Sequence, residues 1–280
     1  MKAPLLRFLV LTGAGLVLSL GGVFLLTSHE PKASSITSTP LELLPDLDQE
    51  TPSQLQLQLT FGHGQRSYRL GFRSAVRNLG DGPLIVNGAR PDGDTPEMTV
   101  DQVVERVGAA PEVIRGVGRM RYVVSPDHRH WHYLSFDRYS LQTYELRSAS
   151  KGAPLVEDQK TGFCLGDRYP VKNPVQAAPT EPVFTSRCGL TRPGKLTMRE
   201  GISVGYGDDY SAFLEGQDLP LDGLPDGRYV LVHRVNADRG LKELTYANNA
   251  ASVLLDLRWQ NGQPSLRVLA RCRDTADCHR

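Results

Sequence analysis

Hydrophobic and polar residues alternate along several short stretches of this chain. Leu55-Gln-Leu-Gln-Leu59 is one such stretch, and residues 68–76 alternate in the same way before the turn residues of 78–82. Alternation with a period of two is the pattern of a strand with one buried face. Similar reasoning predicts strands at 83–86, 120–124, 133–146, 228–235, 251–259 and 265–269. Residues 98–108 (MTVDQVVERVG) instead predict one short helix.

Short strands joined by polar turns determine the expected fold class. The chain contains 27 glycines and 19 prolines, which suits many turns. We therefore expect an all-β fold, an antiparallel, immunoglobulin-like β-sandwich with long irregular loops and little helix. Residues 151–200 have little periodicity and contain six prolines, so they predict a long excursion from the sandwich. Loops of that length in a compact domain are usually functional.

The N-terminus predicts export. Lys2 and Arg7 precede a run without charge at residues 8–27, which predicts an N-terminal hydrophobic helix. Such a run is either a signal peptide or a membrane anchor over residues 1–27, and the missing cleavage site after it favours the anchor. The charge distribution places the remainder on the extracellular or periplasmic side, membrane-anchored or secreted, with membrane contact only through this segment. The composition of residues 28–50 predicts a flexible linker, and we expect residues 51–280 to form the folded domain.

Charge and cysteine content narrow the function classes. The 32 basic and 31 acidic residues give a net charge of +1 without a basic stripe, so we expect no nucleic-acid partner. The four cysteines suit an oxidising compartment, and we expect the pairs Cys164–Cys188 and Cys272–Cys278 because each closes a short loop. A zinc cluster is the alternative, but no C-x-x-C spacing supports it.

Three of the seven histidines fall at His128, His130 and His132. In a strand these side chains share one face, and three imidazoles on one face suit copper or zinc. The residues themselves do not choose between the two metals. In a flat strand the outer two Cα atoms would be roughly 13 Å apart, so the segment must bend to bind one metal. Pro126 favours such a bend because it prevents regular strand pairing. The alternative is a surface strand without metal.

Four motifs occur in order along the chain. They are DHRHWHYLSFDRYSL at 127–141, KTGFCLGD at 160–167, GISVGYGDDY at 201–210, and LPDGRYVL at 224–231 with YANN at 246–249. In this order, over about residues 45–260, they resemble the lysyl oxidase family. The combination is far more specific than any one of the motifs.

The resemblance implies a function and its residues. Copper would be bound by His128, His130 and His132, and Lys160 and Tyr210 would fuse into a lysine tyrosylquinone. The implied activity is that of a copper-dependent amine oxidase, which uses dioxygen to convert primary amines into aldehydes with release of hydrogen peroxide and ammonia. Peptidyl lysine is a candidate substrate.

Some of these assignments have alternatives. Only the register with Phe-Cys-Leu-x-Asp selects Lys160 rather than the nearby Lys151. Asp208 and Asp209 are candidates for the catalytic base, with a turn-forming role as the alternative.

The sequence also departs from the animal members of the family. Asp127 stands where they have a cysteine, and Arg138 and Tyr139 stand where they have a further histidine. In these positions the sequence resembles microbial members of the family. The departures do not support collagen and elastin as its substrates. Two other functions compete: a non-catalytic, metal-binding β-sandwich module of the cell surface, and a zinc hydrolase, which lacks an obvious nearby glutamate base. The Lys160 and Tyr210 pair favours the oxidase, because a structural metal site has no use for it.

Overall fold

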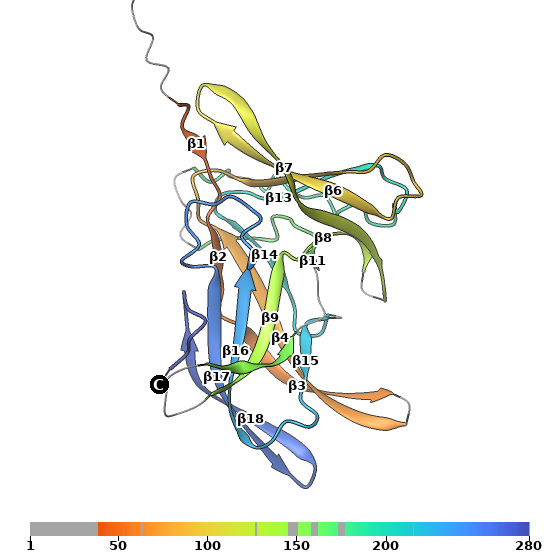
Figure 1. The fold of residues 1–280 in the computed structure, drawn as a ribbon, viewed down its shortest axis with the longest axis vertical. Helices are drawn as coiled ribbons and strands as arrows, with labels where there is room; N and C mark the ends of the chain where they lie inside the picture. Colours follow the sequence, from red (N-terminus) through yellow and green to blue (C-terminus); the bar gives the residue numbers. More distant parts are fainter. Residues whose placement is uncertain are drawn as a thin grey trace, which may run out of the picture. The chain divides into compact units, whose positions relative to one another are not determined.

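A computed structural model describes residues 39–62, 64–126, 128–144, 151–157, 162–172, 177–214 and 216–279, with only the backbone path given for 151–157. Every regular element in these residues is a strand, and the strands pair antiparallel. The expected all-β fold is confirmed (Figure 1). The expected N-terminal helix over 1–27 lies outside the described residues. Within the described part, no helix is long and apolar enough to cross a membrane.

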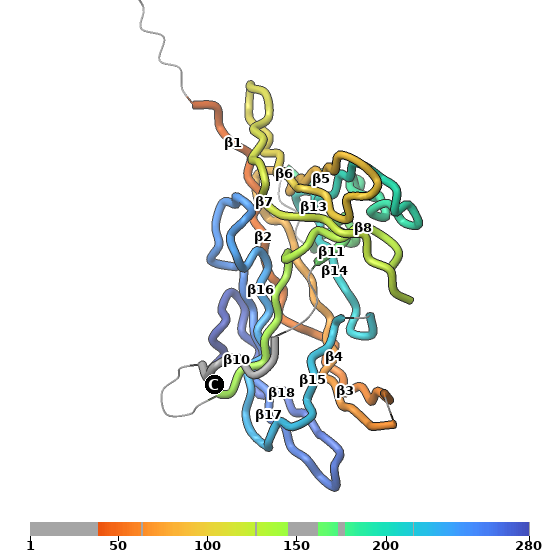
Figure 2. The backbone as a smooth tube through the Cα atoms, turned by 45° about the vertical axis from the view of Figure 1, so that its right-hand side comes forward, coloured from red at the N-terminus to blue at the C-terminus, as the bar shows by residue number. Residues whose placement is uncertain are grey.

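The strands form three sheets (Figure 2). The first sheet has the order β11-β8-β7-β6-β5-β13, with β1 pairing β6; its strands are β1 (Glu42–Leu43), β5 (Leu84–Ala89), β6 (Glu97–Arg106), β7 (Ala109–Val124), β8 (Arg129–Leu134), β11 (Gly162–Phe163) and β13 (Thr197–Ile202). The second has the order β10-β9-β16-β17-β18; its strands are β9 (Asp137–Tyr144), β10 (Lys151–Glu157), β16 (Gly227–Val235), β17 (Ala250–Gln260) and β18 (Gln263–Cys272). The third is built around β4 and contains β2 (Leu47–Gln49), β3 (Ser53–Gly62), β4 (Gln65–Asn78), β12 (Tyr169–Pro170), β14 (Tyr206–Tyr210) and β15 (Asp218–Pro220).

The second and third sheets pack face to face as a sandwich. Leu70 and Phe72 of β4 contact side chains of β9, β16 and β17 in one buried cluster. Phe72 meets Tyr139 edge to face, with ring centroids 5.0 Å apart. In a β-sandwich, the core is formed in this way, by inward-facing side chains of two sheets that interdigitate.

A second buried cluster joins the first and third sheets. It contains Trp131 of β8, Phe163 of β11 and Tyr210 of β14, together with the cystine formed by Cys164 and Cys188. This cluster therefore holds together the three segments that carry the histidines, the Phe-Cys-Leu motif and the candidate cofactor tyrosine.

The helix predicted at 98–108 is wrong, because β6 occupies this segment. Its buried residues alternate as Met98, Val100, Gln102 and Val104. Gln102 is polar and therefore hid the period of two in the sequence. Its side chain is satisfied within the fold, since Nε2 donates to the carbonyl of Lys242 at 2.9 Å and Oε1 accepts from the Lys242 N–H at 2.8 Å.

Residues 42–49, expected in the flexible linker, pair with the sheets. β1 pairs with β6, and β2 pairs with β4. Leu47 is fully buried, and its N–H donates to Glu243 Oε2 at 2.8 Å. These eight residues are therefore part of the folded domain, which begins earlier than the alternation at Leu55 suggested.

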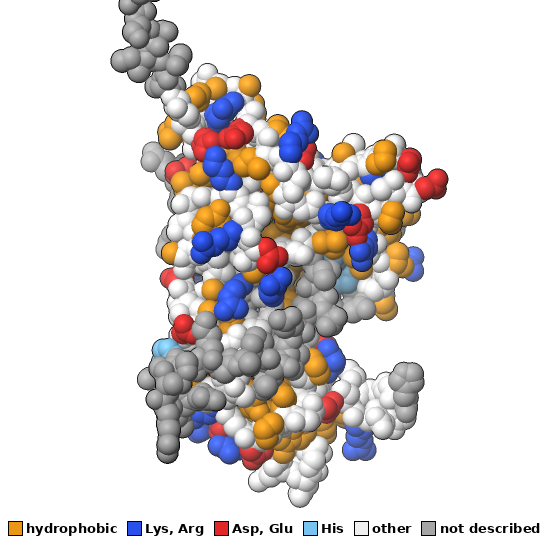
Figure 3. Space-filling view, in the orientation of Figure 1, with side chains coloured by type: hydrophobic (Ala, Val, Ile, Leu, Met, Phe, Trp, Pro, Cys, Tyr) orange, Lys and Arg blue, Asp and Glu red, His pale blue; other side chains and the backbone are white. Residues whose placement is uncertain are grey.

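Both predicted disulfides are confirmed: Cys164 pairs with Cys188, and Cys272 with Cys278. Acidic and basic side chains are interspersed over the face drawn in Figure 3. Charged side chains of the described residues also form ion pairs, such as Arg119 and Arg121 with Glu97 on the first sheet.

Candidate metal centre

The histidine segment begins in the turn between β7 and β8. The N–H of Ser125 donates to the carbonyl of His128 at 2.7 Å, and the N–H of His128 donates to Ser125 Oγ at 3.2 Å. Pro126 lies within this turn, and β8 starts only at Arg129. The chain therefore bends at His128. The sequence analysis predicted such a bend, because the three histidines could not otherwise bind one metal. The strand itself carries only His130 and His132, and His128 reaches their face from the turn.

The three imidazoles converge on one point. The His128 Nδ1 lies 3.3 Å from the His130 Nε2, which lies 2.8 Å from the His132 Nε2. Copper and zinc bind imidazole nitrogen at about 2.0–2.1 Å, so two nitrogens on one ion are separated by about 2.9 Å at a right angle and about 3.3 Å at the tetrahedral angle. These two separations match such a donor set, and the three ligand nitrogens all lie within 4.8 Å of one another. No described carboxylate or cysteine joins the cluster as a further ligand, so among these residues the donor set consists of the three histidines.

Tyr210 is buried beside the histidines. Its ring is nearly parallel to that of His128, with centroids 5.8 Å apart and planes 16° apart. The ring of His132 meets it edge to face at 6.3 Å. Burial is the main cause that raises the pKa of Tyr210, and the neighbouring Asp208 carboxylate raises it further. The phenol is therefore protonated at neutral pH, next to the cluster of nitrogens.

Three consecutive amides of the Phe-Cys-Leu motif are hydrogen-bonded to side chains around Tyr210. The Cys164 N–H donates to the Tyr210 hydroxyl at 2.9 Å, and the Leu165 N–H donates to Glu200 Oε2 at 3.0 Å. The Gly166 N–H donates to Asp208 Oδ2 at 3.1 Å. The residues directly after the Lys160 segment are thus fixed in position against Tyr210.

Gly162 begins this motif at a point where a larger residue does not fit. A Cβ atom added there would lie 2.3 Å from the carbonyl oxygen of Tyr133 on β8. Gly162 pairs with Leu134, and Phe163 pairs with Tyr133. The absence of a side chain therefore allows the motif to add to the histidine strand.

Asp167 ends the motif and fixes it to the third motif. One of its oxygens accepts from the N–H groups of Val183 and Phe184 at 2.7 and 3.0 Å and from the Ser203 hydroxyl at 2.7 Å. The other accepts the N–H of Ser203 at 2.7 Å. A carboxylate with several N–H and O–H donors is well satisfied when buried, so Asp167 has a positioning role.

Glu200 is a buried carboxyl group that the sequence reasoning did not single out. It has no solvent exposure, and burial raises its pKa well above the ordinary value. Its Oε1 has no hydrogen-bond partner among the described residues. The alternation along β13 could have identified Glu200 as a buried residue, because Met198, Glu200 and Ile202 face the same buried side of this strand.

Asp208 is buried near Glu200. Burial raises the pKa of Asp208 to about 8, against the opposing effect of Arg168, whose Nε lies 3.5 Å from its Oδ1. Asp208 and Tyr210 are two residues apart on β14 and so share a face. Asp209 points the other way and pairs with Arg73 at 2.7 Å. Of the two candidate bases, only Asp208 therefore lies on the Tyr210 side.

Lys160 lies outside the described residues. The structure brings together the three histidines, Tyr210 and Asp208 from motifs up to 82 residues apart in sequence, from His128 to Tyr210.

A comparison of the sequence with protein-family models matches residues 117–263, more than half of the 280 residues, to the family described as lysyl oxidase. The chain belongs to the lysyl oxidase family. The match covers the histidine cluster, the Phe-Cys-Leu motif, Tyr210 and both buried carboxyl groups. The resemblance found in the motifs is thereby confirmed.

Curated lysyl oxidase relatives match a shorter region. Lysyl oxidase homolog 1 of Homo sapiens is 28% identical over 123 residues, which are 43% of this chain and 18% of that protein. The protein-lysine 6-oxidase of Gallus gallus is 29% identical over 131 residues, 46% of this chain and 26% of that protein. The protein-lysine 6-oxidase of Sus scrofa is 29% identical over 121 residues, 43% of this chain and 41% of that protein. The match thus spans less than half the length of each of these relatives.

Proposed function

We propose that this protein is a copper-dependent amine oxidase that acts on primary amines, with peptidyl lysine as the favoured substrate class. The observation that carries the proposal is the stacking of Tyr210 on His128 beside two further converging imidazoles. Family membership supports it, since relatives bear the name protein-lysine 6-oxidase.

The proposed cofactors are copper and a lysine tyrosylquinone made from Lys160 and Tyr210. Copper held by His128, His130 and His132 would supply the redox chemistry with dioxygen that an ordinary set of side chains lacks. The overall reaction balances as one primary amine, one dioxygen and one water giving one aldehyde, one ammonia and one hydrogen peroxide.

The protein's own residues would position the two partners of the crosslink. The Cys164 N–H holds the Tyr210 hydroxyl, and the Phe163 ring packs against the Tyr210 ring with centroids 4.2 Å apart. Lys160 precedes Gly162 by two residues, and two residues of extended chain span at most about 7 Å. In sequence, Lys160 is thus a near neighbour of a segment that is hydrogen-bonded to Tyr210.

Asp208 is the proposed proton acceptor for the substrate carbon. It lies on the Tyr210 side of β14, and its pKa of about 8 suits a group that gains and loses a proton near neutral pH. Arg168, 3.5 Å away, favours its charged form. Glu200, held by the Leu165 amide, would keep the Phe-Cys-Leu motif in place and take no direct part in the chemistry.

The proposed setting is the extracellular or periplasmic side, where dioxygen is available and disulfides persist. Two disulfides in the folded domain support this setting. Membrane contact, as an anchor or through a cleaved signal, would be limited to residues 1–27.

The decisive experiment is peptide mass spectrometry of the copper-loaded, oxygen-exposed protein. We expect a crosslinked peptide pair that joins Lys160 to Tyr210, and we expect peroxide release when a simple amine is added. Lys160→Arg should abolish both, whereas the matched control Lys151→Arg should retain both. Copper bound at the histidines with Lys160 and Tyr210 unmodified would refute the oxidase and support the non-catalytic metal-binding module.

A further inference from the structure

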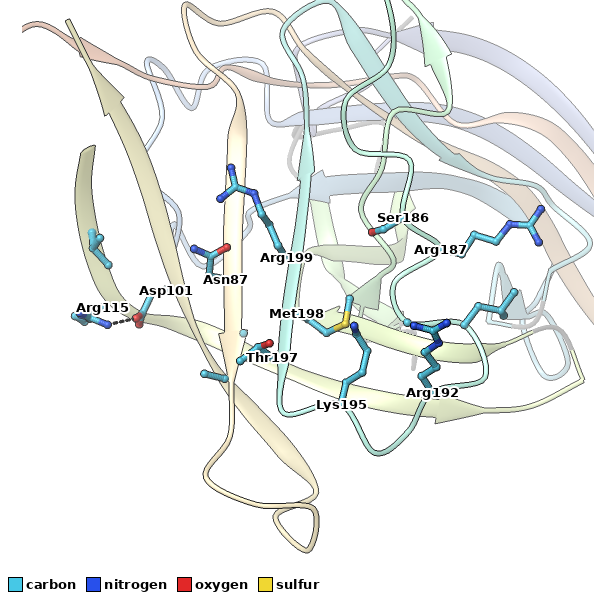
Figure 4. A pocket seen from close by; sticks show the side chains of 15 residues that line it. Asn87, Asp101, Arg115, Ser186, Arg187, Arg192, Lys195, Thr197, Met198 and Arg199 are labelled. Carbon is cyan, nitrogen blue, oxygen red and sulfur yellow. Dashed lines mark hydrogen bonds and ion pairs between the residues drawn. The ribbon is translucent and has the colours of Figure 1, made fainter. Parts of the chain in front are cut away.

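A groove with a volume of about 940 Å³ opens on the first sheet, away from the histidines. Its floor is formed by the paired strands β5 and β13, where Gly88 pairs with Met198 and Ala89 with Thr197. The loop 186–195 forms one wall, and the β6–β7 hairpin forms the other (Figure 4).

The groove is strongly basic. Five cations line it: Arg115, Arg187, Arg192, Lys195 and Arg199. Asp101 is the one acidic residue among the described lining, and it is already paired with Arg115 at 2.5 Å. The ion pairs of the described residues include none of the other four cations. This differs from the face drawn in Figure 3, where opposite charges are interspersed. Of these four cations, Arg199 lies 6.0 Å from the centroid of the Phe184 ring, and no described carboxylate pairs with any of the four.

The wall that carries Arg192 and Lys195 is held rigidly. The buried Arg90 donates to the carbonyls of Pro193 at 2.6 Å and Lys195 at 2.9 Å, and its guanidinium lies 4.8 Å from the ring of Trp131. The Trp131 Nε1 donates to the Arg192 carbonyl at 3.2 Å. A preorganised wall loses less entropy when a ligand binds, so these cations are better placed for binding than free surface side chains.

The lining favours a polypeptide over other polyanions. Arginine binds carboxylates with two parallel hydrogen bonds. Between the cations lie the apolar side chains of Met198, Leu190 and Val113, which suit the aliphatic parts of a peptide. No aromatic side chain lines the groove in the described residues, whereas single-stranded nucleic acids are usually bound by aromatic stacking.

The groove shares its supporting strand with the histidine cluster. The wall loop pairs with β8 through Trp131 N–H to Cys188 O and Thr191 N–H to Arg129 O, both at 2.8 Å. Trp131 packs toward the loop, and His130 and His132 occupy the opposite face of β8, because side chains alternate along a strand.

We infer that this basic groove is a substrate-capture site that binds an acidic segment of the same polypeptide whose lysine is oxidised. The inference rests on the proposed function for the identity of the substrate, but the binding of the acidic segment does not depend on turnover. Because the groove does not touch the reacting atoms, it would lower KM for substrates with an acidic segment and leave kcat unchanged.

The test uses the full-length protein and two fluorescent peptides of about twelve residues, each with one lysine. One peptide carries a run of glutamates, and the other has glutamine at the same positions. The variant Arg187→Gln/Arg192→Gln/Lys195→Gln is compared with the control Arg66→Gln/Lys172→Gln/Arg267→Gln, which removes three cations outside the groove. In fluorescence anisotropy at low salt, we expect the groove variant to bind the glutamate peptide about tenfold more weakly and the control to match the wild type.

Turnover of the same peptides gives the second readout. The groove variant should raise KM about tenfold for the glutamate peptide alone, with kcat and the turnover of a simple amine unchanged. Equal binding of both peptides, or equal loss in the control variant, would overturn the inference. So would tight binding of a sulfated oligosaccharide in the groove without binding of the glutamate peptide. Absence of turnover with every amine would contradict the proposed function, and the anisotropy result would still decide the groove.

Discussion

The backbone N–H of Cys164 donates a hydrogen bond of 2.9 Å to the hydroxyl of Tyr210. This contact links the Phe-Cys-Leu motif to the tyrosine 46 residues later in the chain. It lies between the disulfide on one side and the histidine cluster on the other. The contact therefore connects the candidate metal centre to the segment that follows Lys160.

Tyr210→Phe should destabilise the domain without altering its fold. The substitution leaves the buried N–H of Cys164 without its acceptor, and a buried, unsatisfied polar group costs about 1–3 kcal/mol. Urea unfolding monitored by fluorescence should show this loss as a lower midpoint with an unchanged slope. Tyr206→Phe is the matched control, on the same strand and similarly buried. An equal loss in both variants would argue against the Cys164 contact as the cause.

His130→Ala should abolish stoichiometric copper binding. Its Nε2 lies between the other two ring nitrogens, at 3.3 Å from His128 Nδ1 and 2.8 Å from His132 Nε2, so its loss leaves two ligands. Elemental analysis after copper loading and dialysis should fall from about one copper per chain to near zero. The exposed His279, far from the cluster in sequence, provides the control variant His279→Ala. Full copper content in His130→Ala would refute this ligand.

Thermal stability of the metal-free protein should fall as the pH rises from about 5 to 8. The pKa of Asp208 is raised from 3.8 to about 8, and that of Glu243 is raised from 4.5 to about 7, in both cases mainly by burial. The folded protein therefore holds more protons than the unfolded chain in this window, and stability decreases with pH until the folded-state pKa is passed. Melting temperatures across the window measure the effect.

Asp208→Asn provides the test of this assignment. The variant lacks the titrating group and should show a shallower dependence of melting temperature on pH, whatever its absolute stability. Asp226→Asn, at an exposed position, should retain the wild-type slope. A wild-type slope in Asp208→Asn would show that another group carries the pH dependence.

The two disulfides should differ in their effects. Removing Cys164–Cys188 by a double change to alanine opens a loop with a sequence separation of 24, compared with 6 for Cys272–Cys278. Loop-closure entropy predicts a loss of about 3–4 kcal/mol for the first and about 2–3 kcal/mol for the second. Chemical denaturation measures both.

The first change should also reduce formation of the Lys160–Tyr210 crosslink, because the disulfide anchors the segment whose Cys164 backbone N–H donates to the Tyr210 hydroxyl. The second should not, since Cys272 and Cys278 lie in a separate buried cluster with β16 and β17. Equal crosslink yields in the two double variants would show that the Cys164–Cys188 disulfide is not needed to position Tyr210 for the crosslink.

The sequence alone determined the all-β class, many of the strands, both disulfides and the family. Local alternation predicted about half of the eighteen described strands, because each of these has one buried face, and the short spacing of the cysteines limited their pairing. The helix predicted at 98–108 failed for the same physical reason, because the buried Gln102 interrupts the alternation while its hydrogen bonds to Lys242 are made across 140 residues. A local pattern cannot show a partner that distant.

The tertiary structure decided how the motifs act together. In the structure, His128 lies in a turn, and Asp208 and Asp209 point to opposite faces of β14. Glu200 is buried and accepts a hydrogen bond from the Leu165 N–H. The tertiary structure also assembled a basic groove from four segments of a chain whose net charge is only +1. Composition averages charge over the whole chain, whereas binding depends on which charges the fold leaves without a partner.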